Sequence, residues 1–136
     1  MLVSDVMLGL DKIPSVQQDV IVKVCLEEMG RYRLGIACIV DQSGHLLGIF
    51  TDGDLRRKLL RIQKPIASLF IDDVLEHGIR DPLKVGPSDS LVHAVHLMEL
   101  HQVWDLPVVD SSNMLVGLLH LHPAVKSLLL SYTPKS

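Results

Sequence analysis

The residues best suited to chemistry in this chain lie together between positions 51 and 57. Thr51 offers a hydroxyl group and Asp54 a carboxylate, with Gly53 between them and Arg56 and Arg57 directly after. An ionised carboxylate accepts two hydrogen bonds, so it suits a pair of neighbouring hydroxyl groups such as those of a ribose. Guanidinium groups bind phosphate and carboxylate oxygens, and a glycine lets a ligand approach the backbone closely. The stretch therefore predicts a binding site for a polar ligand.

The same stretch has a simpler structural interpretation. The apolar run Gly48–Phe50 is typical of a strand, and helical spacing follows, so we expect a helix from Asp54 to Ile62. In this interpretation Asp54 only caps the helix and the two arginines lie in solvent. Unpaired N–H groups at a helix start attract anions, so the position suits either role. We favour ligand binding.

The elements that position this stretch occur twice in the chain. Asp41 and Gly48 recur as Asp110 and Gly117, in each case 69 positions later, and Met29 recurs as Met98 at the same spacing. A fixed offset of this kind indicates a tandem repeat. We expect one motif in residues 1–63 and a second in residues 64–136.

The pattern of apolar and turn residues in each repeat predicts two helices and a β-hairpin. Apolar residues at helical spacing mark the first helix of each repeat, with Asp19 and Ser88 as the expected N-caps. The strands and turns follow, and Pro123–Leu130 is the closing helix of the second repeat. The segments that begin Ile13-Pro14 and Asp81-Pro82 are expected to be extended, because a residue before proline is pushed out of the helical region. The helical positions are Val22, Cys25, Leu26 and Met29, then Leu91, Ala94, Val95 and Met98.

These elements predict an α/β (α+β) fold in which the two repeats pack sheet against sheet about a pseudo-twofold axis. Hydrophobic residues make up 48% of the 136 residues and aromatic residues only 4%, so the core must be aliphatic. A net charge of −3, with acids and bases interspersed, argues against nucleic acid or membrane as a partner. Cys25 and Cys38 lie in apolar runs and indicate reduced core residues of a cytoplasmic protein.

Several of these motifs resemble those of a known protein family. The repeated hairpin, closing in GIFTDGD and matched by LPVVD and LVGLL, resembles a tandem pair of CBS domains. More narrowly, IPSV, GIFTDGDLRR and LVGLLHLH resemble the C-terminal region of the arabinose-5-phosphate isomerases, in which a CBS pair follows a catalytic SIS domain. The resemblance implies a regulatory module that binds adenosine nucleotides or related ligands. The SIS domain has no counterpart here, so we expect no catalysis by this chain.

The resemblance also implies roles for particular residues. Thr51 and Asp54 match the hydroxyl and carboxylate with which CBS domains hold a ribose. Ile13-Pro14 and Gly35-Ile36-Ala37 would then form apolar walls around the base. In the second repeat His120 replaces the threonine and Pro123 replaces the aspartate, so we expect one competent site or none. The ligand would be an adenine or cytidine nucleotide or a nucleotide-sugar, and no cofactor is expected to be required.

The histidines and Trp104 give weaker evidence for a functional site. His93 and His96 lie one helical turn apart, and His120 and His122 alternate along a strand end, but neither pair has a third ligand at the usual spacing. We therefore predict no metal site, although His120 could give a pH-sensitive anion contact in the second cleft. No catalytic motif is present. Trp104, placed in a strand, is interpreted as an inter-repeat or dimer contact.

Three functions remain open. The first is a ligand-sensing regulatory module that acts on a SIS isomerase domain, in cis or in trans. The second is a structural module that holds a homodimer together through apolar residues on the closing helices. The third, an autonomous enzyme, has little support. The residues expected at the dimer contact are Leu59, Leu60, Leu128 and Leu129.

Overall fold

The chain forms two compact units, each with its own sheet and helices. The computed structural model describes residues 1–61 and 65–131. Residues 12–82 make one unit, which we call the Thr51 unit. Residues 1–11 join residues 83–136 in the other, which we call the His120 unit. Ile62 and the expected repeat boundary between residues 63 and 64 lie outside the described residues.

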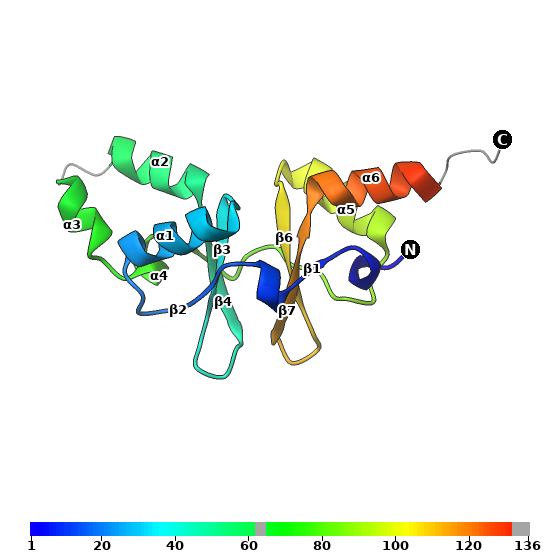
Figure 1. Ribbon diagram of the computed structural model, residues 1–136, viewed down its shortest axis with the longest axis horizontal. Coiled ribbons are helices and arrows are strands. Elements are labelled where there is room, and N and C mark those ends of the chain that lie inside the picture. Colours follow the sequence, from blue (N-terminus) through cyan, green and yellow to red (C-terminus); the bar gives the residue numbers. More distant parts are fainter. Residues whose placement is uncertain (62–64, 132–136) are drawn as a thin grey trace. The chain divides into compact units, whose positions relative to one another are not determined.

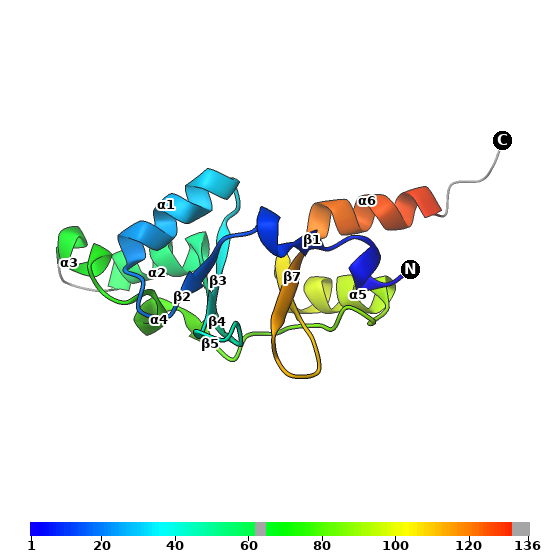
Figure 2. The same cartoon turned by 60° about the horizontal axis from the view of Figure 1, so that its bottom comes forward.

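The Thr51 unit contains a four-stranded sheet in the order β2-β3-β4-β5. Strand β2 runs parallel to β3, and the other neighbours are antiparallel. Figures 1 and 2 show α1 and α2 on the same side of β3 and β4. In chain order the elements are η2 (Leu10–Lys12), which overlaps the unit boundary, β2 (Ser15–Gln17), α1 (Val22–Tyr32), β3 (Ile36–Val40), β4 (Leu46–Thr51), α2 (Asp52–Arg61), α3 (Ile66–Phe70), α4 (Val74–His77) and β5 (Ile79–Arg80).

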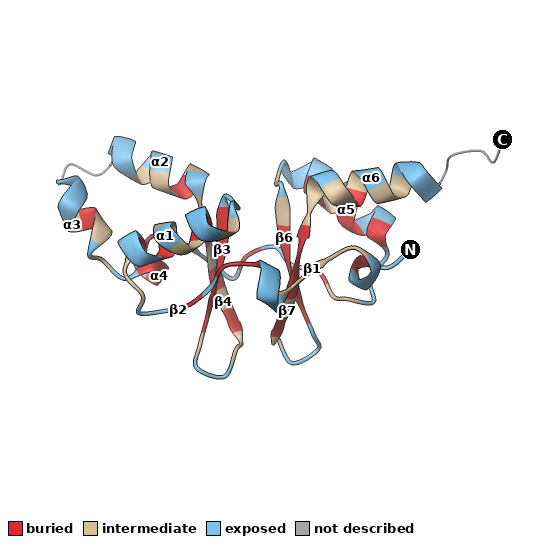
Figure 3. Cartoon of the chain, in the orientation of Figure 1, coloured by how far each residue is buried: buried red, intermediate tan, exposed pale blue. Residues whose placement is uncertain are grey.

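The core of this unit lies between α1 and the sheet. Val22, Cys25 and Met29 of α1 are buried, and they cluster with Ala37 and Phe50 of the sheet. Every residue of β3 is buried, as the sequence predicted, and Figure 3 shows the buried residues following the strands and the inner sides of the helices. The helical spacing therefore identified the packing face correctly.

The His120 unit contains a three-stranded sheet in the order β1-β7-β6. Val85 adds a single parallel bridge to Val108, at the position that β2 occupies in the Thr51 unit. The apolar faces of α5 and α6 pack on this sheet around Leu91, Met98 and Ala124. The elements are η1 (Val3–Asp5), β1 (Leu8–Gly9), α5 (Leu91–His101), β6 (Asp105–Val109), β7 (Leu115–His120) and α6 (Leu121–Ser131).

The two hairpin turns make the same hydrogen bonds to backbone N–H groups. Asp41 Oδ1 accepts hydrogen bonds from two backbone N–H groups, those of Ser43 and His45, each at 2.9 Å. Asp110 Oδ1 accepts the equivalent bonds from Ser112 and Met114 at 2.9 and 3.0 Å. The bonds to Asp41, led by the one from the His45 N–H, lower the pKa of the Asp41 carboxyl below its usual range. Gly44 and Asn113 both have positive φ, which confirms the turn prediction.

The repeats in the sequence and the compact units in the structure divide the chain at different places. Strand β1, from the start of the first repeat, pairs with β7 of the second, with Leu8 opposite Leu118. Strand β5, from the start of the second repeat, pairs with β4 of the first, with Ile79 opposite Ile49. Each sheet is thus completed by the leading segment of the other repeat.

Several local predictions were wrong. Asp19 is not the N-cap of α1, because Ile21 takes that place and the Val22 N–H donates to the Asp72 carbonyl instead. Ser90, and not Ser88, caps α5 by accepting from the His93 N–H. Both helices start later than the sequence predicted because backbone contacts with other segments fix where they begin.

The start of α2, the segment at Asp81 and the position of Trp104 also differ from the prediction. Helix α2 begins at Asp52, so Asp54 lies inside its first turn. Asp81 has a φ of 49° and is not extended; its N–H donates to the Leu47 carbonyl where β5 ends. Trp104 immediately precedes β6 and is not part of it. Helix α6 begins at Leu121, which keeps Pro123 in the first turn as predicted.

Candidate functional site at the start of helix α2

Thr51 and Asp54 bond to each other where β4 turns into α2. The Asp54 N–H donates to Thr51 Oγ1 at 3.1 Å. In return Asp54 Oδ2 accepts from the Thr51 N–H at 2.9 Å and from the Thr51 hydroxyl at 3.0 Å. This reciprocal pattern is a capping box with aspartate in place of the usual glutamate. The capping role that competed with ligand binding is therefore present, with Thr51 as the N-cap.

The second carboxylate oxygen of Asp54 faces a cation. Arg57 donates to Asp54 Oδ1 at 2.7 Å, while the Asp54 side chain is 7% exposed and the Arg57 side chain 48%. A side chain on Gly53 would meet this guanidinium, because a Cβ there would lie 3.2 Å from an Arg57 nitrogen. Arg56 is exposed. The junction therefore pairs one buried carboxylate with the guanidinium of Arg57, and Arg56 follows from the same turn into solvent-exposed surface.

The predicted wall residues lie next to this junction in the same unit. Ile36 pairs with Thr51 across β3 and β4, and the Asp52 N–H donates to the Gly35 carbonyl at 3.0 Å. The segment Ile13-Pro14 lies along β3, since the Pro14 carbonyl accepts from the Cys38 N–H. Ile13, Pro14, Ile36 and Ala37 are buried, whereas Gly35 is exposed. Ten of the eleven predicted residues thus belong to one end of the Thr51 unit.

His120, the eleventh residue, lies at the equivalent place in the His120 unit. Its Nδ1 lies 2.7 Å from Asp105 Oδ1, and the two residues pair across β6 and β7. Burial raises the pKa of the Asp105 carboxyl above its usual range, and the His120 hydrogen bond and charge oppose that rise. Pro123 has no N–H to return a capping bond. This junction therefore has an acid–imidazole pair in place of the capping box.

Asp105 is the residue that the sequence analysis missed at this junction. The offset of 69 positions, applied to Ile36, leads directly to Asp105. Antiparallel pairing then places it opposite His120, as the structure shows. The repeat offset together with the hairpin register is therefore the signal that identifies Asp105.

The two histidine pairs noted in the sequence are not part of a potential metal-binding cluster among the described residues. Across residues 1–61 and 65–131, the groups with three potential metal ligands do not include His93, His96, His120 or His122. Asp72, Glu76 and His77 form such a group, with ligand atoms within 4.8 Å of one another. In that group His77 Nε2 lies 2.8 Å from Asp72 Oδ2, so the two side chains form a hydrogen-bonded pair beside α4.

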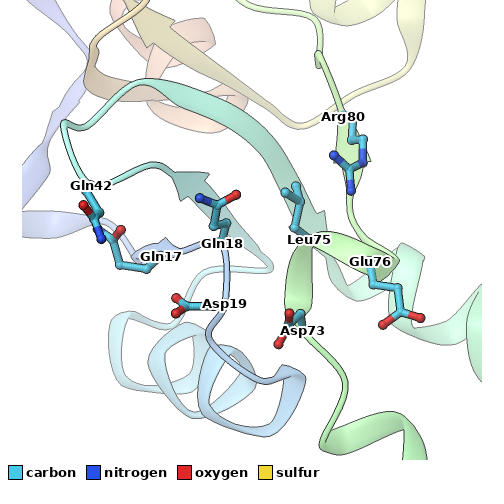
Figure 4. A pocket seen from close by; sticks show the side chains of 8 residues that line it. All are labelled: Gln17, Gln18, Asp19, Gln42, Asp73, Leu75, Glu76 and Arg80. Carbon is cyan, nitrogen blue, oxygen red and sulfur yellow. The ribbon is translucent and has the colours of Figure 1, made fainter.

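A separate polar pocket of about 690 Å³ lies in the Thr51 unit away from the capping box. Figure 4 shows glutamines and Asp19 on one side of it and Leu75, Glu76 and Arg80 on the other. It contains three carboxylates and one guanidinium, which is a poor charge balance for a phosphate. None of the predicted site residues lines this pocket. Its lining residues are Gln17, Gln18, Asp19, Gln42, Asp73, Leu75, Glu76 and Arg80.

The repeated fold and the two junctions agree with a known family. The CBS domain family matches residues 3–61 and 71–122, which cover both repeats and both junctions. The chain belongs to the CBS domain family. It is a tandem CBS pair, and the resemblance seen in the sequence is confirmed.

Relatives of this CBS pair include an enzyme and several solved CBS structures. Arabinose 5-phosphate isomerase KdsD of Escherichia coli (strain K12) is 34% identical over 125 residues, covering 92% of this chain and 37% of that protein. The chain thus spans little more than a third of the isomerase. A crystal structure of CBSX2, a protein of Arabidopsis thaliana, in complex with AMP matches 97% of this chain and 98% of that chain with a TM-score of 0.84 and 26% identity. A CBS domain pair/ACT domain protein from Thermotoga maritima matches 98% of this chain and 100% of that chain with a TM-score of 0.77 and 26% identity.

Within the described part of the CBS pair, no helix is both long enough and apolar enough to cross a membrane. Both cysteines are buried and unbonded to each other, as the sequence predicted for core residues.

Proposed function

We propose that this CBS pair is a regulatory module that binds a nucleotide or a nucleotide-sugar at the start of α2. The observation that carries the proposal is the capping box itself, in which a nearly buried carboxylate is paired with the half-exposed guanidinium of Arg57. The His120 unit forms the same strand-to-helix junction without this carboxylate, so the fold does not require it. A relative at 26% identity was crystallised with AMP, which supports this class of ligand.

The proposed contacts follow from the bonding capacity left at the junction. Asp54 Oδ1 accepts one bond from Arg57, and a carboxylate oxygen has a second lone pair for a ribose hydroxyl. Arg56 and Arg57 meet the phosphate, aided by the N-terminus of α2. Gly53 and the exposed Gly35 let the ligand approach the backbone. The base lies against the segments Ile13-Pro14 and Ile36-Ala37.

The two junctions differ in their expected affinity. The His120 unit has a proline where the ribose carboxylate would be needed, and its acid, Asp105, already bonds to His120. We therefore propose one competent nucleotide site, at Thr51. His120 is proposed only as an anion contact.

The module acts on an enzyme outside this chain. Because the chain covers 37% of KdsD, we propose that it regulates a sugar-phosphate isomerase of the SIS family, either within a longer polypeptide or as a separate subunit. No catalytic role is proposed for the CBS pair itself. A nucleotide-sugar would be a suitable feedback signal for such an enzyme in the cytoplasm. Nucleic acid and membranes are not among the proposed partners.

A thermal-shift titration with adenine nucleotides, cytidine nucleotides and a cytidine-linked acidic sugar tests the proposal. A ligand at 100 times its Kd stabilises the folded state by about 2.7 kcal/mol, which raises the melting temperature by several degrees. Asp54→Asn should abolish the shift. His120→Thr, the matched change at the other junction, should leave it intact. The absence of a shift with every ligand, or an undiminished shift in the Asp54 variant, would refute the proposed site.

A second candidate function is a dimerisation module, favoured by apolar side chains that the helices leave exposed. Leu60 is 81% exposed and Leu129 is 66% exposed, and Leu59 is also exposed. Leu128, however, is only half-exposed and packs against the core of the His120 unit, so its prediction as an exposed contact was wrong. Self-association and ligand binding are compatible, since they use different residues.

A further inference from the structure

The short helix α4 brings three potential metal ligands together inside the Thr51 unit. Asp72, Glu76 and His77 each offer one ligand atom, and these atoms lie within 4.8 Å of one another. His77 Nε2 and Asp72 Oδ2 are 2.8 Å apart. Imidazole and carboxylate groups are both zinc ligands, and three protein ligands leave the fourth position of a tetrahedral site to water. We call this group the His77 cluster.

His77 is the buried member of the cluster. Its side chain is 5% exposed, whereas that of Asp72 is 21% exposed and Glu76 lies at the surface. Nδ1 of the imidazole is buried and has no hydrogen-bond partner among the described residues. A buried polar atom without a partner is costly, and in folded proteins such an atom commonly marks a bound water molecule or ion. This nitrogen therefore points to a ligand beside the imidazole, independently of the two carboxylates.

Two of the three ligands belong to a short insertion in the second repeat. Asp73 corresponds to Asp5, 68 positions earlier. Ile79 corresponds to Leu8, 71 positions earlier, because the two residues pair with equivalent positions of β4 and β7. Residues 76–78 therefore have no counterpart in the first repeat. Both units form the same strand pair with or without these residues, so the fold does not require them.

Charge and access at the cluster favour a cation. Glu76 also lines the polar pocket of about 690 Å³, together with Asp19, Asp73 and Arg80 (Figure 4). Three of these four ionisable side chains are carboxylates, so the balance of charge is negative, and the pocket gives a hydrated ion a route to Glu76. The imidazole decides between cations, because Mg²⁺ and Ca²⁺ prefer oxygen ligands whereas zinc and its neighbours in the periodic table accept nitrogen.

We propose that Asp72, Glu76 and His77 bind one Zn²⁺ ion, with water as the fourth ligand. Ligand atoms of a tetrahedral zinc site lie about 3.3 Å apart, so small movements of the side chains, chiefly of the exposed Glu76, complete the site. The Asp72 carbonyl accepts from the Val22 N–H at 2.9 Å, so the ion strengthens the attachment of the segment before β5 to the start of α1. A zinc ion here revises the prediction of no metal site, and its binding is independent of nucleotide binding.

Isothermal titration calorimetry of the untagged full chain with ZnCl₂, after treatment with a chelator, measures the affinity and the stoichiometry. We expect one tightly bound ion per chain and a higher melting temperature with Zn²⁺ than with Mg²⁺. Glu76→Gln changes an exposed side chain and should leave the circular dichroism unchanged. It should weaken zinc binding at least about tenfold, because even an outer contact of a metal site is typically worth 10–100-fold in affinity. His77→Gln should weaken it by at least as much.

His45→Gln is the matched control. His45 Nδ1 lies 3.0 Å from Asp41 Oδ2, a similar pair, but neither residue belongs to a group of three potential ligands among the described residues. This variant should bind zinc as tightly as the wild type. No zinc binding by the wild type, undiminished binding in Glu76→Gln, or an equal rise in melting temperature with Mg²⁺ would overturn the inference. Both measurements are made without nucleotide, so their outcome is separate from that of the nucleotide titration.

Discussion

At the scale of single residues, one carboxylate serves several partners. Asp54 accepts two bonds from Thr51 through one oxygen and one from Arg57 through the other. These bonds hold the start of α2 and fix the orientation of the carboxylate that we propose as a ligand contact. Under the proposed function, substitutions here should affect both stability and binding, and the two effects need separate measurements.

Thr51→Val removes the capping hydroxyl without changing the shape of the side chain. The Asp54 N–H then loses its acceptor, so we expect the free energy of unfolding to fall by about 1 kcal/mol. Thr51→Ser keeps the hydroxyl and should cost clearly less. Urea denaturation followed by circular dichroism measures both. Equal losses in the two variants would mean that the hydroxyl does not cap the helix.

Cys25 should be unreactive in the folded protein. Burial, and to a smaller degree the charge of Glu28, raise the pKa of its thiol from 9.0 to about 12. Folding thus favours the neutral thiol, so the contribution to stability is complete below pH 9 and is lost as the pH rises toward about 12. Mass spectrometry after iodoacetamide treatment at pH 8 should show Cys25 unmodified in buffer and modified in urea. Rapid modification in buffer would contradict this.

At the scale of elements, the short strands β1 and β5 approach their partners at glycines. A Cβ on Gly48 would lie 2.6 Å from the Ile79 carbonyl oxygen, and a Cβ on Gly117 would lie 2.6 Å from the Leu8 carbonyl oxygen. The repeated glycine of the sequence motif is thus explained by strand pairing. Only glycine allows the leading segment of one repeat to reach the sheet of the other.

Gly48→Ala tests this close approach. We expect a loss of about 1–3 kcal/mol in the free energy of unfolding, because the added methyl group must displace β5. Gly30→Ala is the matched control, since a Cβ there has no neighbour within 4 Å and alanine favours the helix. It should leave the protein as stable or slightly more stable. Thermal unfolding of both variants gives the comparison, and a neutral Gly48→Ala would argue against the β4–β5 pairing.

The elements that the sequence predicted well are those with a local signal. Helices α1 and α5 followed from apolar residues at helical spacing, and the hairpins from Asp41, Gly44 and their repeats. The helix starts were less predictable, because the Val22 N–H bonds to a carbonyl 50 residues away instead of a local cap. Helix α3 has no strong periodicity and was not predicted. At the site, capping by Asp54 was foreseen as an alternative, but Thr51 is the N-cap and Asp54 returns the bond from inside the helix. The Asp105–His120 pair depended on strand register.

At the scale of the whole molecule, the first residues of the chain stabilise its last repeat. Val3 is fully buried in the cluster that contains Leu91 and Met98. Its N–H donates to the Asp89 carbonyl at 2.9 Å. This exchange of leading segments could not be read from periodicity, because a two-residue strand such as Leu8–Gly9 has no sequence pattern of its own. The two repeats therefore depend on each other for folding.

Val3→Ala should destabilise the His120 unit although it lies in the first repeat. Removing buried methyl groups from a packed core costs about 1–3 kcal/mol. Trp104 lies in the His120 unit, so its emission during urea unfolding should report the loss directly. Leu2→Ala is the control, because Leu2 is exposed and its change should have little effect. If the urea midpoint reported by Trp104 emission were unchanged in Val3→Ala, this would contradict the packing of the first residues against the last repeat.

We propose that a nucleotide binds at the start of α2 and not at the equivalent junction of the other repeat. A ¹H–¹⁵N NMR titration of the full chain with AMP and CMP tests it most directly, because every backbone N–H reports separately. We expect shifts concentrated at Gly35 and at residues 51–57 that saturate with ligand, and little change at Trp104 and residues 120–126. No shifts with either nucleotide, or shifts centred on His120 instead of Thr51, would contradict it.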